Sequence, residues 1–200
     1  MFHRLIWVAR LGVLLLVIVV AISLDASSSS SHRNEVRQQW QTKADDISLK
    51  LQSSILQNIQ TVWGLAANVS IQPDINGQRF RELAAVIISL APELQNIGLA
   101  PGFVIRHIYP LEGNTAALGL DLTAQSLSPE QIDALLDSRR EVFSGPINLV
   151  QGGQGLAGRI PIFEQATGEF WGVVSVILDL EKLYSSIGLD RLEDGFNLAL

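Results

Sequence analysis

Apolar and polar positions divide the chain into regions with different patterns, and the first is almost wholly apolar. Residues 5–24 contain one charged side chain, Arg10. A helix of about twenty such residues is roughly 30 Å long, which matches the hydrocarbon core of a bilayer. The pattern therefore predicts a transmembrane anchor over residues 1–24.

The charges around this segment predict its direction. Arg4 and Arg10 lie at its beginning, whereas residues 25–31 carry one acidic residue and no basic one. Basic flanks stay on the cytoplasmic side, so we expect the rest of the chain to lie in the periplasm or extracellular space of a bacterium. A cleaved signal peptide is the alternative, because a basic start before a short apolar core also fits one. Export follows in both cases.

The second region has helical periodicity. Between residues 33 and 70 apolar side chains recur every three or four positions, and no proline interrupts them before Pro73. This predicts one long amphipathic stalk helix, preceded by a flexible polar linker at residues 27–31. Its apolar stripe must be buried. We expect the part from Ile55 on to pack against its own domain and the lower part to pair with a second copy in a homodimer. Packing of the whole helix on its own domain is the alternative.

The third region, residues 71–200, mixes short helices with strands. We expect helices over 78–91, 128–140 and 180–187, and strands over 94–101, 103–111, 141–150, 159–165, 170–180 and 195–200. Ser128 before Pro129 is a typical helix start. Consecutive hairpins predict an antiparallel sheet with helices on one face, an α+β domain of PAS-like shape.

Composition excludes several classes of function. The net charge is −6 and no basic run occurs outside the N-terminal segment, so we expect no nucleic-acid partner. There is no cysteine and the three histidines are scattered. We therefore expect no metal, no cofactor and no catalytic residues, although a periplasmic hydrolase or lyase is the enzymatic alternative.

Residues 153–158, GQGLAG, match the glycine pattern of dinucleotide-binding loops. The segment that follows, RIPIF, reads as a strand containing Pro161 rather than as a helix. Without a helix N-terminus there is no dipole to bind a pyrophosphate. We interpret residues 152–158 instead as a glycine-rich turn whose glycines supply positive φ angles.

Four blocks carry a family resemblance: IGLAP at 97–101, YPLEGNTAALGLDL at 109–122, SGPINLVQGGQGLAGRIPIF at 144–163 and FWGVVSVILDLEKLY at 170–184. Together they resemble the CHASE domain, the extracellular sensor of bacterial histidine kinases, diguanylate cyclases and plant cytokinin receptors. The resemblance implies a dimeric sensor that relays small-molecule binding to a cytoplasmic kinase or cyclase. It also implies a second membrane helix, and neither this helix nor an output domain is present in these 200 residues. A structural module that mediates dimerisation or partner binding without a small ligand is the alternative function.

The resemblance also implies a ligand pocket, in which Asp121 contacts the ligand and Ser144 lines the site. The candidate ligand-binding residues are Asp121, Ser144, Leu149, Gln151, Phe103 and Leu118. From the residues alone, Asp121 and Ser144 fit turn or capping roles as well as ligand contact. Arg159 could bind an anionic ligand or pair with Glu141 nearby on the sheet, and we expect the ion pair.

Overall fold

The computed structural model describes residues 2–149 and 153–189, with side chains described from residue 37 on except at residue 125. The chain forms two units, Met1–Leu49 and Lys50–Leu200. Within the fully described part no helix is long and apolar enough to cross a membrane, and the predicted anchor at 5–24 lies outside that part.

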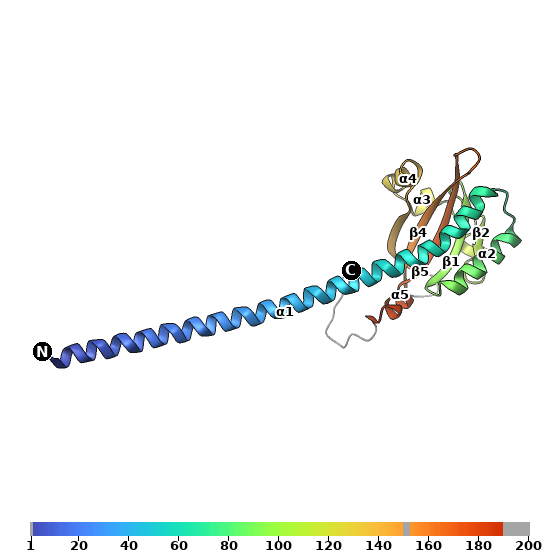
Figure 1. The fold of residues 1–200 in the computed structure, drawn as a ribbon. Coiled ribbons are helices and arrows are strands. Elements are labelled where there is room, and N and C mark those ends of the chain that lie inside the picture. Colours follow the sequence, from blue (N-terminus) through green and yellow to red (C-terminus); the bar gives the residue numbers. More distant parts are fainter. Residues whose placement is uncertain (1, 150–152, 190–200) are drawn as a thin grey trace. The chain divides into compact units, whose positions relative to one another are not determined.

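The first helix is longer than predicted. Helix α1 (Phe2–Ile71) continues through residues 27–31, where we expected a flexible linker (Figure 1). The expectation of a flexible linker is therefore wrong, because the backbone of these residues is helical. Each serine costs less than about 0.7 kcal/mol relative to alanine in a helix, so a short serine run between helical segments does not force a break.

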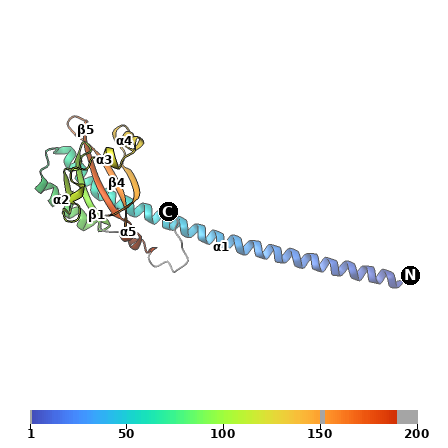
Figure 2. The ribbon, with the colours of Figure 1, turned by 180° about the vertical axis from the view of Figure 1, so that it is seen from behind.

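The second unit is an α+β domain, as predicted. Its further elements are α2 (Gly77–Leu90), β1 (Leu94–Pro101), β2 (His107–Tyr109), the 3-10 turn η1 (Thr115–Ala117), α3 (Leu122–Gln125), α4 (Pro129–Leu136), β3 (Val142–Asn148), β4 (Gln154–Phe163), β5 (Phe170–Asp179) and α5 (Leu180–Ser186). The five strands form one antiparallel sheet in the order β2-β1-β5-β4-β3. Strand β5 lies at its centre (Figure 2). The predicted strand at 195–200 lies outside the described residues.

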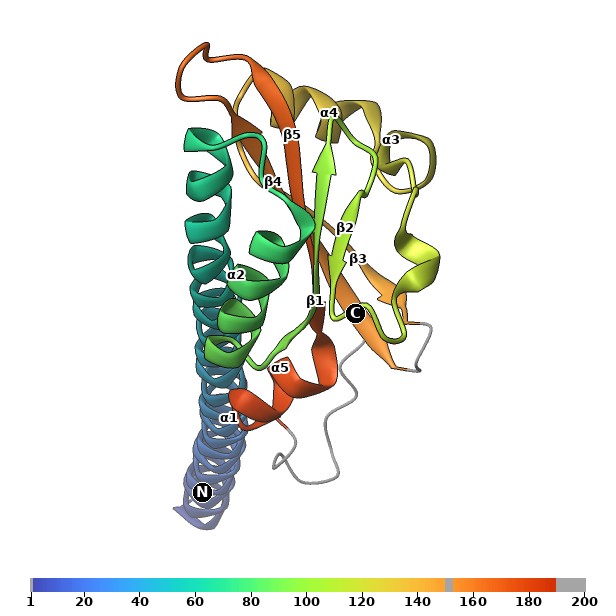
Figure 3. The same cartoon turned by 90° about the vertical axis from the view of Figure 1, so that its right-hand side faces the viewer.

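One face of the sheet, which we call the α1 face, carries the main core. Its strand residues are Ile97, Leu99, Ile160, Ile162, Val174, Val176 and Leu178. Each is at most 1% exposed. They pack against Ile59, Val62 and Val69 of α1 and against residues of α2, which lies on the same side of the sheet (Figure 3). The prediction that the stripe from Ile55 on packs on its own domain is confirmed.

Close approach of α1 to the sheet depends on a glycine. A Cβ on Gly158 would lie 2.9 Å from Val176 Cγ2 and 3.2 Å from Ile59 Cδ1. Gly158 therefore lies within β4 and serves packing rather than a turn. Of the predicted turn at 152–158, Gly153 has a positive φ of 78°, whereas the strand begins at Gln154. The antiparallel sheet agrees with the rejection of a dinucleotide site.

The opposite face, which we call the α4 face, carries a second and smaller core. Strand residues Ala100, Val142 and Val173 pack there against Leu122 of α3 and Leu135 of α4. Helices therefore cover both faces, and the expectation of helices on one face is wrong. Helix α4 begins with the predicted cap, completed by a reciprocal Ser128–Gln131 capping box. It ends at Leu136, four residues early, and Arg139 soon afterwards adopts a left-handed φ of 52°.

Candidate ligand-sensing site

The register of the sheet places a polar row across the middle of the α4 face. Gly98 of β1 pairs with Ser175 of β5, Ser175 pairs with Arg159 of β4, and Arg159 pairs with Val142 of β3. Residues paired in register on adjacent strands lie on the same face. A Cβ on the preceding residue, Gly158, would point to α1. The side chain of Arg159 therefore points to the α4 face.

Side chains around Arg159 on this face are short. Within the row, Gly98 has none and Ser175 has one hydroxymethyl group. A neighbouring row runs through Asn96, Ile177, Ala157 and Ser144. The register therefore brings the predicted residue Ser144 one row away from Arg159.

Arg159 is buried, and no described residue carries a charge that pairs with it. Its side chain is 5% exposed, and Ser175 beside it is also buried. Its Nη1 donates to the Gly158 carbonyl at 3.1 Å, and its Nε has no hydrogen-bond acceptor among the described residues. Burial alone lowers the pKa of the guanidinium to about 10, so the group remains protonated at neutral pH. A buried unpaired charge costs several kcal/mol, which makes Arg159 a source of instability in the free domain.

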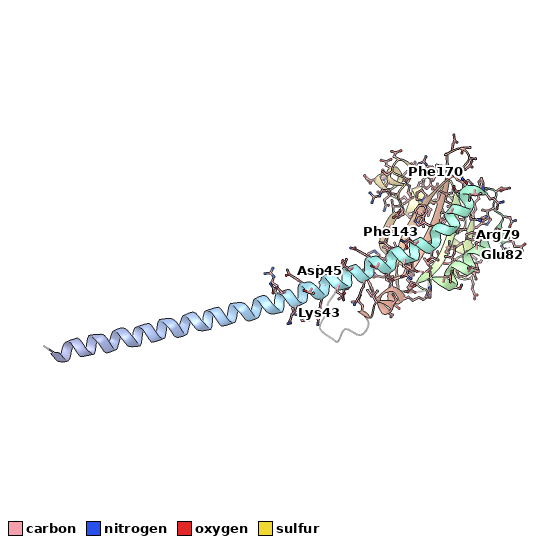
Figure 4. All side chains as sticks on the ribbon, viewed as in Figure 1. Lys43, Asp45, Arg79, Glu82, Phe143 and Phe170 are labelled. Carbon is pink, nitrogen blue, oxygen red and sulfur yellow. The ribbon has the colours of Figure 1, made fainter. Side chains whose placement is uncertain are left out.

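The expected ion pair between Arg159 and Glu141 is absent from the described part of the chain. Arg159 pairs across the sheet with Val142, and Glu141 precedes the strand. An ion pair lies instead on α2, where Arg79 Nη1 is 3.6 Å from Glu82 Oε2 and both side chains are more than half exposed (Figure 4). The predicted closeness on the sheet fails because the residue opposite Arg159 is Val142, and the side chains of adjacent residues such as Glu141 and Val142 point in different directions.

Ser144 connects the sheet to α4. Its hydroxyl accepts a hydrogen bond of 2.9 Å from Gln131 Nε2, and the same nitrogen donates to the Phe143 carbonyl at 2.9 Å. Gln131 Oε1 accepts from the Ser128 backbone nitrogen as part of the capping box. The hydroxyl proton of Ser144 remains available for another acceptor.

Asp121 caps α3. Its Oδ1 accepts from the backbone nitrogen of Thr123 at 2.9 Å and from the Thr123 hydroxyl at 2.7 Å. The Thr123 hydroxyl and then its backbone nitrogen lower the pKa of Asp121, so the carboxylate is ionised at neutral pH. The capping role that the residue pattern allowed is therefore observed, and ligand contact stays a prediction.

Of the other predicted residues, only Phe103 packs against the second core in the described part of the chain. Phe103 is half-buried, packs against that core, and its ring centroid lies 5.0 Å from that of Phe170 (Figure 4 labels Phe170). Leu118 follows η1 and is 43% exposed, and Leu149 follows β3 at the position that faces Gly155. Gln151 lies outside the described residues.

Sequence reasoning missed the row itself. Gly98 and Ser175 were read only as parts of strands, and no sequence signal pairs positions 98, 175 and 159. A charged residue within the apolar run LAGRIPIF was the available clue. Unpaired charges are rarely placed on a buried strand, so an arginine there suggests function.

A hollow lies beside α1, away from the predicted residues. It has a volume of about 120 Å³ and is lined by Ser54, Gln57, Asn58, Thr61, Leu90, Ala91, Pro92 and Glu93. Asn58 is buried there, and its Oδ1 has no partner among the described residues. No group of three or more His, Asp or Glu side chains in the described part could hold a metal ion.

Two solved structures with a similar fold are a ligand binding receptor and the ligand-binding domain of a chemoreceptor. An extracellular ligand binding receptor from Desulfohalobium retbaense is similar over 74% of this chain and 27% of its own, with a TM-score of 0.58 and 21% identity. The ligand-binding domain of the Pseudomonas aeruginosa amino acid chemoreceptor PctC, solved with GABA, is similar over 69% of this chain and 61% of its own, with a TM-score of 0.50 and 21% identity. The chain thus spans less than two thirds of either protein. No curated protein matches it.

The antiparallel sheet with helices on both faces is the fold that this chain shares with these two proteins. Comparison with protein families is more specific, because the CHASE domain matches residues 37–200. The chain belongs to the CHASE-domain family, and its α+β domain is a sensory domain. The match begins within α1, so the family includes part of the stalk helix.

Proposed function

We propose that this chain is the ligand-sensing module of a membrane receptor, in which a small molecule bound on the α4 face changes how α1 packs on the opposite face. Residues 1–24 form the anchor, residues 25–70 a helical stalk that continues through residues 27–31, and residues 71–200 the sensor. The signal passes through the membrane to a histidine kinase or diguanylate cyclase output domain. Asp121, Ser144 and Phe103 are among the ligand contacts.

One observation carries this proposal. Consecutive residues of β4 face the two sides of the sheet, with Gly158 under Ile59 of α1 and Arg159 on the α4 face. A shift of β4 on ligand binding therefore reaches the helix directly. The ligand can drive the shift only through a difference in its affinity for the two arrangements.

Binding is tested by thermal unfolding of the full chain in mild detergent against a library of small metabolites. A sensor gains stability as the ligand concentration rises, by about 2.7 kcal/mol at 100 times the dissociation constant. A compound that raises the melting temperature in a saturable way supports the proposal. A complete lack of response favours the alternative, an interaction module without a small ligand. Leu56 and Trp63 of α1 are 50% and 38% exposed, and exposed apolar side chains of this size favour that alternative.

Anchoring and orientation follow from the apolar segment at residues 5–24 and its basic start. We expect an alkaline phosphatase reporter fused after residue 30 to be active, because the enzyme folds only after export. The same fusion with residues 5–24 deleted is the control and should be inactive. An inactive reporter on the intact segment would contradict the proposed topology.

Dimerisation through the lower stalk is testable because the chain has no cysteine. Ala44 belongs to the apolar stripe, and Asp46 lies roughly 200° further around the helix. We expect Ala44→Cys to form a disulfide-linked dimer under mild oxidation and Asp46→Cys to remain monomeric on non-reducing gels. Equal cross-linking of the two variants, or of neither, would rule out this stripe as the dimer contact.

A further inference from the structure

The Arg159 guanidinium is the most unusual polar group of the described domain. It is 5% exposed, its Nε lacks an acceptor, and its Nη1 reaches only the neighbouring Gly158 carbonyl, at 3.1 Å. No acidic side chain in the described residues pairs with it. A guanidinium has five N–H donors, and natural proteins seldom bury them unsatisfied.

The residues beside this group in the row, Gly98 and Ser175, are small. Gly98 has an ordinary φ, and a Cβ there would meet nothing nearer than 3.6 Å, at Ile105 Cγ2 and Ser175 Cβ. Neither backbone geometry nor crowding therefore requires glycine at this position. Because Gly98 has no side chain, no atoms project from the sheet at this position beside Ser175 and Arg159. A molecule bound on this face would need such a position to approach Arg159.

We propose that Arg159 binds the carboxylate of a small monocarboxylic acid on the α4 face, with Ser175 beside it as a second donor. This inference rests on the proposed sensing function and names its ligand class. The planar guanidinium offers two parallel N–H groups that match the two oxygens of a carboxylate.

The charge of the row and the apolar residues around it indicate the class of ligand. The row has one cation, so a single negative charge neutralises it, whereas a phosphate dianion would leave an uncompensated negative charge in a buried place. The surrounding core is apolar, formed by side chains such as Ala100, Val142 and Val173. The acid should therefore have a compact apolar body attached to its carboxylate.

The test compares acids with their uncharged amides. The full chain in mild detergent is unfolded thermally with acetate, butyrate, hexanoate and benzoate, and with the matching carboxamides, at equal ionic strength. We expect at least one carboxylate to raise the melting temperature in a saturable way, and its amide to leave it unchanged. Equal effects of an acid and its amide would overturn the proposal.

Variants at position 159 supply a readout that does not need the ligand. Arg159→Met replaces a buried unpaired charge with an apolar chain of similar length, so we expect a higher melting temperature without ligand and no response to carboxylates. Arg106→Met, at an exposed arginine, is the matched control and should respond as the wild type does. A lower ligand-free melting temperature for Arg159→Met would assign Arg159 a structural role and overturn the proposal.

A second variant tests whether the paired N–H groups of the guanidinium recognise the carboxylate. Arg159→Lys keeps the charge but loses the paired donors, and we expect its carboxylate affinity to fall roughly tenfold or more. An unchanged affinity would contradict paired recognition. If neutral metabolites alone stabilise the wild type and Arg159→Met equally, the carboxylate inference fails and the sensing function stands. If no metabolite or carboxylate stabilises the protein, both fail.

Discussion

The α1 face and the α4 face belong to the same strands but are packed differently. On the α1 face, alternate residues of β1, β4 and β5 are large aliphatic side chains that are almost fully buried under two helices. On the α4 face, the middle of these strands carries Gly98, Ser175 and Arg159. The α1 face therefore supplies the stabilising apolar packing, whereas the polar row on the α4 face lowers the stability of the domain.

This difference shows how a single sheet can combine rigidity with sensing. Close packing on the α1 face transmits small shifts, because packed cores are not continuously deformable. Short side chains and an unpaired cation on the α4 face provide a place where a ligand can change the energy of the domain. Changes to the two faces should therefore have effects of different size and sign.

The largest effect is expected on the α1 face. Ile160 is fully buried in the centre of β4, and Ile160→Ala removes methyl groups that neighbours cannot replace. We expect a loss of about 2–5 kcal/mol in the free energy of unfolding, measured by urea denaturation. Val86→Ala on α2 is the control, since Val86 is 58% exposed and should change little. A cost below about 1 kcal/mol for Ile160→Ala would mean that this face is loosely packed.

A smaller effect tests the contact between β4 and α1. Gly158→Ala places a methyl group 2.9 Å from Val176 Cγ2 and 3.2 Å from Ile59 Cδ1, so we expect a loss of about 1–3 kcal/mol. Gly64→Ala is the matched control on α1, where a Cβ meets nothing within 4 Å. This helix substitution should stabilise by about 0.5–1 kcal/mol. Urea denaturation of both variants measures the two effects, and the same sign in both would contradict the proposed close approach.

The smallest effect concerns pH at the edge of the α1 face. His107 stacks on Phe80 with ring centroids 5.6 Å apart, and burial, then Arg81 and Arg106, lower the pKa of its imidazole. The folded state therefore binds a proton less readily than the unfolded state. Its contribution to stability is present above pH about 6.5 and is lost as the pH falls through the lower folded-state pKa.

Urea denaturation between pH 7 and pH 5 measures this contribution. His107→Gln should flatten the pH dependence relative to the wild type, since the other titrating groups are unchanged. The same slope in both proteins would show that His107 does not contribute.

Local patterns were sufficient for most elements. The periodicity of α1 and α2, the Ser128–Gln131 cap, the β4–β5 hairpin and α5 all follow from residues close together in the sequence. The short α3 and the 3-10 turn were missed because they have too few residues for a periodic signal. Asp121 and Ser144 could be selected from the family blocks, but their hydrogen bonds to Thr123 and Gln131 required the fold.

The sequence by itself determined the kind of protein: an α+β sensory domain of the CHASE family following a long helix. Only the tertiary structure decided what lies on each face of the sheet. Register between distant strands brings Gly98, Ser175 and Arg159 into one row and separates Arg159 from Glu141. The reason is physical: burial and charge compensation depend on neighbours in space, whereas periodicity and capping depend on neighbours along the chain.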